Sequence, residues 1–103
     1  MPEKISQTSN WHDEQTDNLC RAFLNLESID EVYNFLEDIA TIGEIKSMAQ
    51  RLEVARLLGM SKKYPEIVNE TGASTATISR VKKCLDYGAG GYKNALAKLN
   101  LEK

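Results

Sequence analysis

The chain has 103 residues, of which 42% are hydrophobic and 27% are charged, which is the composition of one soluble globular domain. It has no run of about 18 apolar residues and no basic-then-apolar leader, so we expect a cytoplasmic protein with no membrane partner. One histidine and two distant cysteines, Cys20 and Cys84, exclude a Cys/His metal cluster and predict free thiols.

The formal net charge of −2 conceals an uneven distribution of charge along the chain. Residues 1–43 hold two basic and nine acidic residues, a formal charge of −7. Residues 44–103 hold eleven basic and six acidic residues, a formal charge of +5. A protein that contacts nucleic acid through one face needs such a basic region. Ordinary solvated helix faces explain the same asymmetry.

The beginning of the sequence is polar and lacks a periodic pattern, so we interpret residues 1–8 as a mobile N-terminal arm. Residues 9–103 are predicted to form a single helical domain. A first helix is predicted to start near Ser9 or Asn10, and its second half carries a moderately apolar stripe. No strand-like alternation persists anywhere in the sequence, so the predicted fold class is all-α.

The adjacent residues Trp11, His12 and Asp13 invite a catalytic interpretation. Side chains at successive helical positions diverge by about 100°, however, so they cannot converge on one substrate atom. We therefore expect a partly buried tryptophan beside a surface histidine, both near the start of the first helix.

Two capping boxes predict where the second and third helices begin. Ser28 and Glu31 form the first box, and apolar residues then recur at helical spacing as far as Ile39. Thr41 and Glu44 repeat the box before a third helix with a wide apolar stripe. Two such helices have more apolar surface than one small core takes in, which favours a helical dimer, although a well-packed monomeric bundle shows much the same pattern.

The stretch 64–85 is predicted to be a helix-turn-helix. Pro65 suits the first turn of its first helix, Gly72 can take the left-handed conformation that ends this helix, and Ser74 can cap the second. The apolar positions expected to lock the two helices together are Ile67, Ala73, Ile78 and Val81. A helical hairpin that never touches nucleic acid is the alternative on this pattern alone.

Small polar and basic side chains would be left on the outer face of the second helix. Hydroxyls and an arginine can bond base edges or phosphates, a methyl group can meet thymine, and flanking lysines attract phosphate. Backbone N–H groups at the helix starts offer further phosphate contacts. The residues predicted to contact DNA are Ser74, Thr75, Ala76, Thr77, Ser79, Arg80, Lys82, Lys83, Lys62 and Lys63.

A glycine-rich break, Asp86–Gly91, follows the motif. No strand precedes it and no Gly-Lys-Ser/Thr follows it, so it is interpreted as a flexible connector and not as a phosphate-binding loop. The last predicted element is a short amphipathic helix from Tyr92 to about Leu101, which must dock on its own core or on a partner subunit.

Three segments of the chain carry a family resemblance: Gln50-Arg-Leu-Glu-Val-Ala-Arg-Leu-Leu58, Gly72-Ala-Ser-Thr-Ala-Thr-Ile-Ser-Arg80 and Asp86-Tyr-Gly-Ala-Gly-Gly-Tyr92. They resemble the tryptophan-repressor superfamily, and within it the TrpR-like YerC/YecD branch, from about Phe23 onward. The resemblance implies an intertwined, all-helical homodimer of about six helices per chain, in which the N-terminal helices of both subunits build one core.

In the tryptophan repressor the indole of the corepressor lies between two arginines, and the resemblance implies that Arg51 and Arg80 match them. The repressor then has a glycine and a serine that helps to hold the ammonium group, whereas this chain has Val81 and Cys84. Valine would fill the space left open by glycine, and a thiol is a poor substitute for that hydroxyl. We therefore predict that the protein requires no cofactor. A small-molecule corepressor bound at Arg51, Arg80 and Cys84 would be a molecule other than L-tryptophan.

The sequence thus predicts a sequence-specific DNA-binding transcriptional regulator, most simply a repressor, that binds double-stranded DNA as a homodimer. Two recognition helices would lie one helical turn of DNA apart, about 34 Å. The alternative is a helical interaction module that binds an acidic protein partner with the same basic face. An enzyme is not expected, because no paired carboxylates, nucleophile with a base, or metal set lies at a workable spacing.

Overall fold

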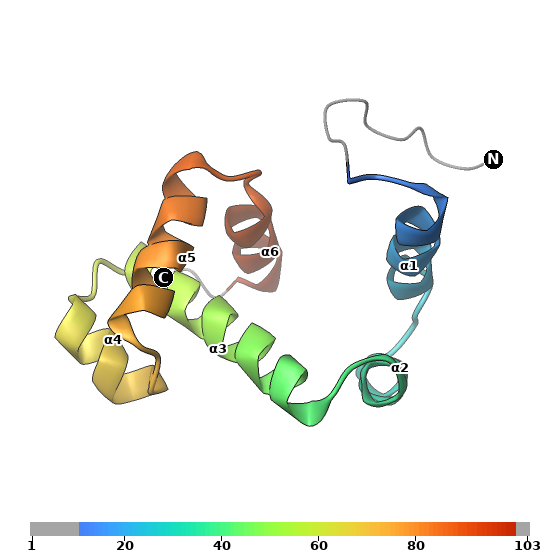
Figure 1. Cartoon of the computed structure of the whole chain (residues 1–103), viewed down its shortest axis with the longest axis horizontal. Coiled ribbons are helices and arrows are strands. Elements are labelled where there is room, and N and C mark those ends of the chain that lie inside the picture. The colour runs from blue at the N-terminus through green and yellow to red at the C-terminus, as the bar shows by residue number, and fades with distance from the viewer. Residues whose placement is uncertain (1–10, 101–103) are drawn as a thin grey trace. The chain divides into compact units, whose positions relative to one another are not determined.

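The structure is a computed structural model that describes residues 11–100 (Figure 1). Over this range the chain forms six α-helices and no strand, which confirms the predicted all-α class. The helices are α1 (Glu14–Leu24), α2 (Ile29–Ile39), α3 (Ile42–Gly59), α4 (Tyr64–Thr71), α5 (Thr75–Tyr87) and α6 (Gly91–Leu99). None of the helices in this range is both long enough and apolar enough to span a membrane. The predicted mobile arm at residues 1–8 lies outside the described residues.

The chain divides between Thr41 and Ile42 into two compact units. The first unit contains α1 and α2, and the second contains α3, α4, α5 and α6. The organisation of residues 9–103 as one domain depends on how the two units meet in the assembled protein, so it stays a prediction.

Helix α1 begins at Glu14, later than the sequence analysis predicted. Asp13 caps it, because the carboxylate of Asp13 accepts a hydrogen bond of 2.7 Å from the backbone N–H of Thr16. This bond lowers the pKa of Asp13 below its ordinary value. Residues 11–13 are not helical, so the predicted start near Ser9 or Asn10 is wrong. The N-cap at Asp13 is the stronger signal for where the helix starts.

Trp11 and His12 lie before α1 and contact each other edge to face, with ring centroids 4.4 Å apart. Trp11 is 66% exposed and His12 is half-buried, so the expectation of a partly buried tryptophan beside a surface histidine is wrong. The reason is the late start of α1, since no helix turns the indole toward apolar neighbours. The carboxylate of Asp13 is engaged in the helix cap.

Helix α2 begins at the predicted capping box, with one difference in its hydrogen bonds. The hydroxyl of Ser28 accepts a bond of 3.1 Å from the backbone N–H of Glu31. The carboxylate of Glu31 accepts in turn from the backbone N–H of Glu27, at 3.3 Å, one residue before the expected donor. The rings of Phe23 on α1 and Phe35 on α2 pack edge to face at 5.0 Å and link the two helices.

In the second unit α4, α5 and α6 all pack against α3, and α4 also packs against α5 (Figure 1). A single cluster of buried side chains joins the four helices. Its members are Val54, Ala55 and Leu57 of α3, Ile67 of α4, Ala73 of the turn, Ile78 and Val81 of α5, and Leu96 of α6. All four apolar positions predicted to lock the helix-turn-helix belong to this cluster. Full burial of one large aliphatic side chain stabilises a fold by about 1.5–3 kcal/mol, so this cluster holds the motif together.

The turn of the helix-turn-helix is built on Gly72. Its φ of +74° lies in the left-handed region, and its N–H donates to the carbonyl of Val68 at 2.8 Å. The hydroxyl of Thr71 accepts a bond of 3.1 Å from the backbone N–H of Ala73. The side-chain amide of Gln50 donates to the carbonyl of Thr71 at 3.1 Å, which ties α3 to this turn.

The connector between α5 and α6 is shorter than predicted. Helix α5 continues to Tyr87 and α6 begins at Gly91, so the predicted flexible connector Asp86–Gly91 is helical at both ends. Gly88 closes α5 by donating its N–H to the carbonyl of Cys84 at 2.8 Å. A Cβ atom at Gly88 would lie 2.4 Å from that same oxygen, so the tight reversal of the chain requires glycine there.

Replacing Gly72 by alanine is expected to lower the free energy of unfolding by about 1–2 kcal/mol, because an L side chain is strained in the left-handed region. Gly59→Ala is the matched control. Gly59 ends α3, and a Cβ atom built there meets nothing within 4 Å. Urea denaturation measures both variants, and an equal loss in the two would contradict the role assigned to Gly72.

Candidate nucleic-acid interface

Helix α5 turns one face into the core and the other face to solvent. Ile78 and Val81 are buried, and the side chains on the opposite face are exposed. The exposed set, called here the reading face, consists of Thr75, Ala76, Ser79 and Arg80. It offers two hydroxyls, one methyl group and one guanidinium on about one and a half turns of helix. These groups are able to hydrogen-bond base edges and to contact a thymine methyl.

Two further residues predicted to contact DNA form the N-terminal cap of α5. The hydroxyl of Ser74 accepts a bond of 3.1 Å from the backbone N–H of Thr77. The same hydroxyl donates to Oγ1 of Thr77, also at 3.1 Å. Thr77 is half-buried and Ser74 is exposed. These two hydroxyls are therefore hydrogen-bonded to each other, directly beside the reading face.

The two lysines that follow the reading face differ in their surroundings. Nζ of Lys82 forms an ion pair with Asp86, 2.9 Å from Oδ2 and 3.2 Å from Oδ1. The hydrogen bond to Asp86 raises the pKa of Lys82 above its ordinary value. Lys83 is exposed, and it has no ion-pair partner between residues 11 and 100. Lys83 is thus the more available of the two cations for a phosphate group.

The other predicted pair of lysines lies in the turn before α4. The backbone N–H of Lys62 donates to the carbonyl of Leu57 at 3.1 Å, and the side chain of Lys62 is half-buried. Lys63 is exposed at the N-terminus of α4, where its backbone N–H donates to Oε1 of Glu66 at 2.9 Å. Pro65 occupies the first turn, as predicted.

The residues implied as an effector site do not share either of two cavities in the described part of the chain, one of about 380 Å³ and one of about 340 Å³. Cys84, a free and exposed thiol, lines a cavity of about 380 Å³ at the turn between α5 and α6. Arg51 of α3 and Arg80 of the reading face do not line that cavity. Val81 is fully buried in the core, so its side chain fills the space beside α5. The effector site at Arg51, Arg80 and Cys84 stays a prediction.

Sequence reasoning missed the ion pair between Lys82 and Asp86. The signal was present, because opposite charges four residues apart on one helix face are neighbours. It also missed that a cavity lies between α3, α5 and α6, since no sequence pattern reports the space left between packed helices. Within residues 11–100 no group of three or more histidine, cysteine, aspartate or glutamate side chains gathers as a metal site.

A left-handed glycine turn, buried locking residues and a polar, basic outer face are typical of helix-turn-helix proteins that bind DNA. The comparison with protein families agrees with this class. The family model described as Trp repressor protein matches residues 14–100, and the chain belongs to this family. The family consists of regulators and not of enzymes.

Individual relatives confirm the resemblance to the TrpR-like YerC branch. The chain is 54% identical over 82 residues to YerC of Bacillus subtilis (strain 168), a protein described as uncharacterized, and the match covers 80% of this chain and 79% of YerC. A TrpR-like protein from Eubacterium eligens superposes with a TM-score of 0.83 at 45% identity, covering 86% of this chain and 92% of that one. A candidate Trp repressor from Staphylococcus aureus superposes with a TM-score of 0.88 at 40% identity, covering 96% and 99%.

The cap assignment gives a test that separates two serines on the same helix. Ser74→Ala removes the acceptor for the Thr77 N–H, so the free energy of unfolding is expected to fall by about 1 kcal/mol. Ser79→Ala removes an exposed hydroxyl, and its stability is expected to stay within about 0.5 kcal/mol of the parent. Thermal denaturation measures both, and equal losses would contradict the cap.

Proposed function

We propose that this protein is a sequence-specific DNA-binding transcriptional regulator, in which α5 is the recognition helix. The observation that carries the proposal is the reading face, exposed on a helix whose opposite face is buried in the helix-turn-helix core. Membership of the Trp repressor protein family supports it, and the name of that family favours repression over activation.

The chemistry of the reading face supports a role in reading bases. Arg80 can donate two hydrogen bonds to one guanine, which is the commonest specific contact in the major groove. The hydroxyls of Thr75 and Ser79 can bond base edges or phosphates, and the methyl group of Ala76 can pack on a thymine. Lys63 at the N-terminus of α4 and Lys83 of α5 are exposed, and they would neutralise phosphates.

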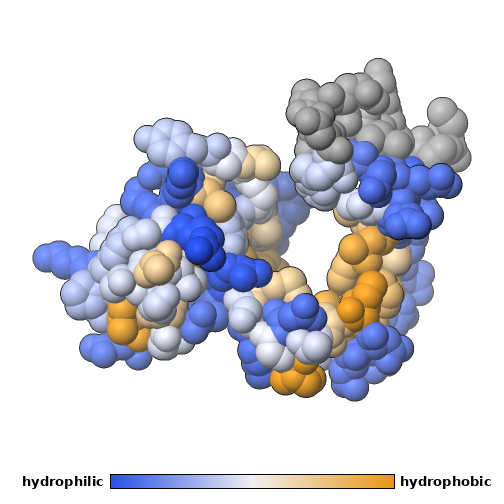
Figure 2. All heavy atoms as spheres, viewed as in Figure 1, coloured by the Kyte–Doolittle hydropathy of each residue, from blue (hydrophilic) through white to orange (hydrophobic). Residues whose placement is uncertain are grey.

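We infer that the regulator acts as a homodimer, because the first unit lacks a core of its own. Between Trp11 and Thr41 no side chain is fully buried. Large apolar side chains are nevertheless exposed on α1 and α2, with Leu24 at 68% and Ile29 at 72%, and Figure 2 shows apolar atoms gathered on these helices. The large exposed side chains of α1 and α2 are Leu19, Phe23, Leu24, Ile29, Tyr33 and Ile39. A second copy of the chain would cover them and would bring two recognition helices to one operator.

A protein-interaction module is the second candidate, because the same basic residues could meet an acidic partner. The two candidates differ in how they respond to DNA sequence. Specific binding to DNA requires a preferred site, whereas an acidic protein partner would leave only weak, sequence-independent attraction to the phosphates.

Selection of bound DNA from a random-sequence pool tests the leading proposal. A near-palindromic site is expected to be enriched, and its affinity is expected to fall steeply as salt is raised. On the selected site, Arg80→Ala is expected to weaken binding by about 1–3 kcal/mol. The charge-matched control is Lys98→Ala, at an exposed position in the last turn of α6, and it should leave affinity almost unchanged. No enriched site, or equal losses in the two variants, would argue against base reading by α5.

Sedimentation equilibrium tests the homodimer. Ile29→Glu places a charge among the exposed apolar residues of α2, and it is expected to shift the protein from dimer to monomer. Met60→Glu is the control, since Met60 is an exposed apolar residue in the turn between α3 and α4. A monomeric parent protein, or dissociation in both variants, would contradict the inferred interface.

A further inference from the structure

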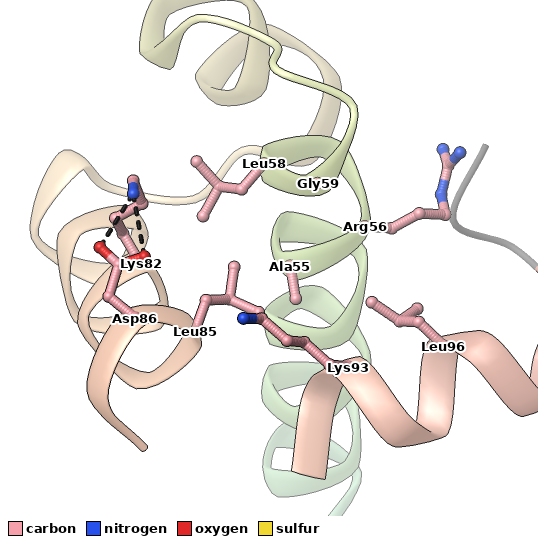
Figure 3. Close-up of a pocket in the computed structure, with 9 residues that line it drawn as sticks. All are labelled: Ala55, Arg56, Leu58, Gly59, Lys82, Leu85, Asp86, Lys93 and Leu96. Atoms are coloured by element: carbon pink, nitrogen blue, oxygen red, sulfur yellow. Dashed lines mark hydrogen bonds and ion pairs between the residues drawn. The ribbon is translucent and has the colours of Figure 1, made fainter. Parts of the chain in front are cut away.

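A cavity of about 340 Å³ lies between α3, α5 and α6, entirely within the second unit (Figure 3). Apolar side chains from all three helices form much of its lining: Ala55 and Leu58 of α3, Leu85 of α5 and Leu96 of α6. Its volume is at the lower end of the range for ligand pockets, which extends from about 300 to 1,000 Å³. The space suits a small molecule with an apolar body.

Four charged residues also line this cavity, and most of their charge is already paired. Lys82 and Asp86 form an ion pair at 2.9 Å, drawn as dashed lines in Figure 3. Arg56 pairs with Glu53 of its own helix at 2.6 Å, and its guanidinium points away from Leu58 and Leu85 in Figure 3. The fourth charged residue is Lys93 of α6.

Lys93 is the unbalanced charge of the cavity. Its side chain has no ion-pair or hydrogen-bond partner within residues 11–100. In the view of Figure 3 its side chain extends from α6 toward Leu85 of α5, and Lys93, Leu85 and Ala55 all line the same cavity. Lys93 is exposed, and one unpaired ammonium beside an apolar lining attracts one negative charge.

We propose that this cavity is a binding site for a small monocarboxylate with an apolar aliphatic or aryl body, held by a charge-assisted bond to Lys93. The apolar body lies against Leu58, Leu85 and Leu96, and the carboxylate accepts from Nζ of Lys93. The ion pair between Lys82 and Asp86 borders the site on α5. The site is separate from the effector site implied by the family resemblance, because Arg51, Arg80 and Cys84 do not line it.

A ligand here would act on the recognition helix, and this consequence rests on the proposed function. The cavity is bordered by the C-terminal half of α5, whose N-terminal half carries the reading face. A molecule that contacts α3, α5 and α6 together biases the position of α5 against α3. Binding of the carboxylate and binding of DNA are then linked, and each changes the affinity of the other by the same factor.

The binding step is tested without DNA, on the ¹⁵N-labelled full-length protein. 3-Phenylpropanoate is the probe, and 3-phenylpropanamide is its uncharged match. Titration in the millimolar range, followed by NMR, is expected to shift the amide signals around Ala55, Leu85 and Lys93 with the acid. The amide is expected to bind at least about fivefold more weakly, because it lacks the charge that Lys93 attracts.

Three variants locate the site. Lys93→Gln is expected to weaken binding of the acid at least about fivefold, whereas Lys98→Gln, on the same helix but outside the cavity lining, should not change it. Gly59→Leu is expected to abolish binding with every charge retained, because Gly59 lines the cavity and a Cβ atom there meets nothing within 4 Å. A thermal melt of each variant shows whether it is folded.

Four results would overturn the proposed site: equal affinity for acid and amide, equal losses in Lys93→Gln and Lys98→Gln, unchanged binding in folded Gly59→Leu, or dissociation of the dimer by Gly59→Leu. The last result would assign the cavity to the subunit interface. In a separate gel shift on the selected DNA, a saturating concentration of the acid is expected to change affinity about fivefold or more. Failure to bind any DNA would contradict the proposed function and leave the carboxylate site standing, whereas DNA binding indifferent to the acid would contradict the linkage.

Discussion

The burial of Ile78 and Val81 against α3 and α4 is the contact on which the rest of the structure depends. A helix has 3.6 residues per turn, so once these two side chains point inward the rotation of α5 about its own axis is fixed. The reading face must then point to solvent. Base edges are distinguished by hydrogen bonds of defined direction, and a helix free to rotate could not present hydroxyls and a guanidinium at a constant angle. The same buried cluster reaches α6 through Leu96, so α5 and α6 pack on the same core.

The two units of the chain differ in how much apolar surface they bury and in the sign of their charge. The second unit has a buried core and most of the basic residues, so it can fold around α3 and offer charge to phosphates. The first unit is acidic and has no fully buried side chain in its described part, although it carries large apolar residues. Covering this surface with a second copy would give both units a core. A dimer would then place two weakly bound recognition helices on one duplex, where the second contact is made at a high effective concentration.

Local signals in the sequence were sufficient for the helix-turn-helix. Gly72 has the predicted left-handed conformation, Ser74 caps α5, and the four predicted locking residues are buried, because each feature depends on neighbours a few positions away. Errors arose where several local signals competed or where the outcome depended on packing. Asp13 and the acidic residues after it start α1 more strongly than the polar residues before it, and the exposure of Trp11 followed from that later start. The prediction that Lys82 contacts phosphate leaves out its ion pair with Asp86, four residues on. The cavity beside Lys93 depends on the distances between α3, α5 and α6, and a single sequence does not specify how far apart packed helices lie.

Two copies of α5 are proposed to read one duplex from its major groove. Methylation protection on the selected site measures this most directly, since dimethyl sulfate attacks guanine N7 in the major groove, the atom that Arg80 is proposed to contact. The proposed mechanism predicts two protected clusters of guanines whose centres lie about one helical turn apart, about 34 Å, with both clusters lost together in Arg80→Ala. A single protected cluster, or none on a site that the protein binds tightly, would contradict it.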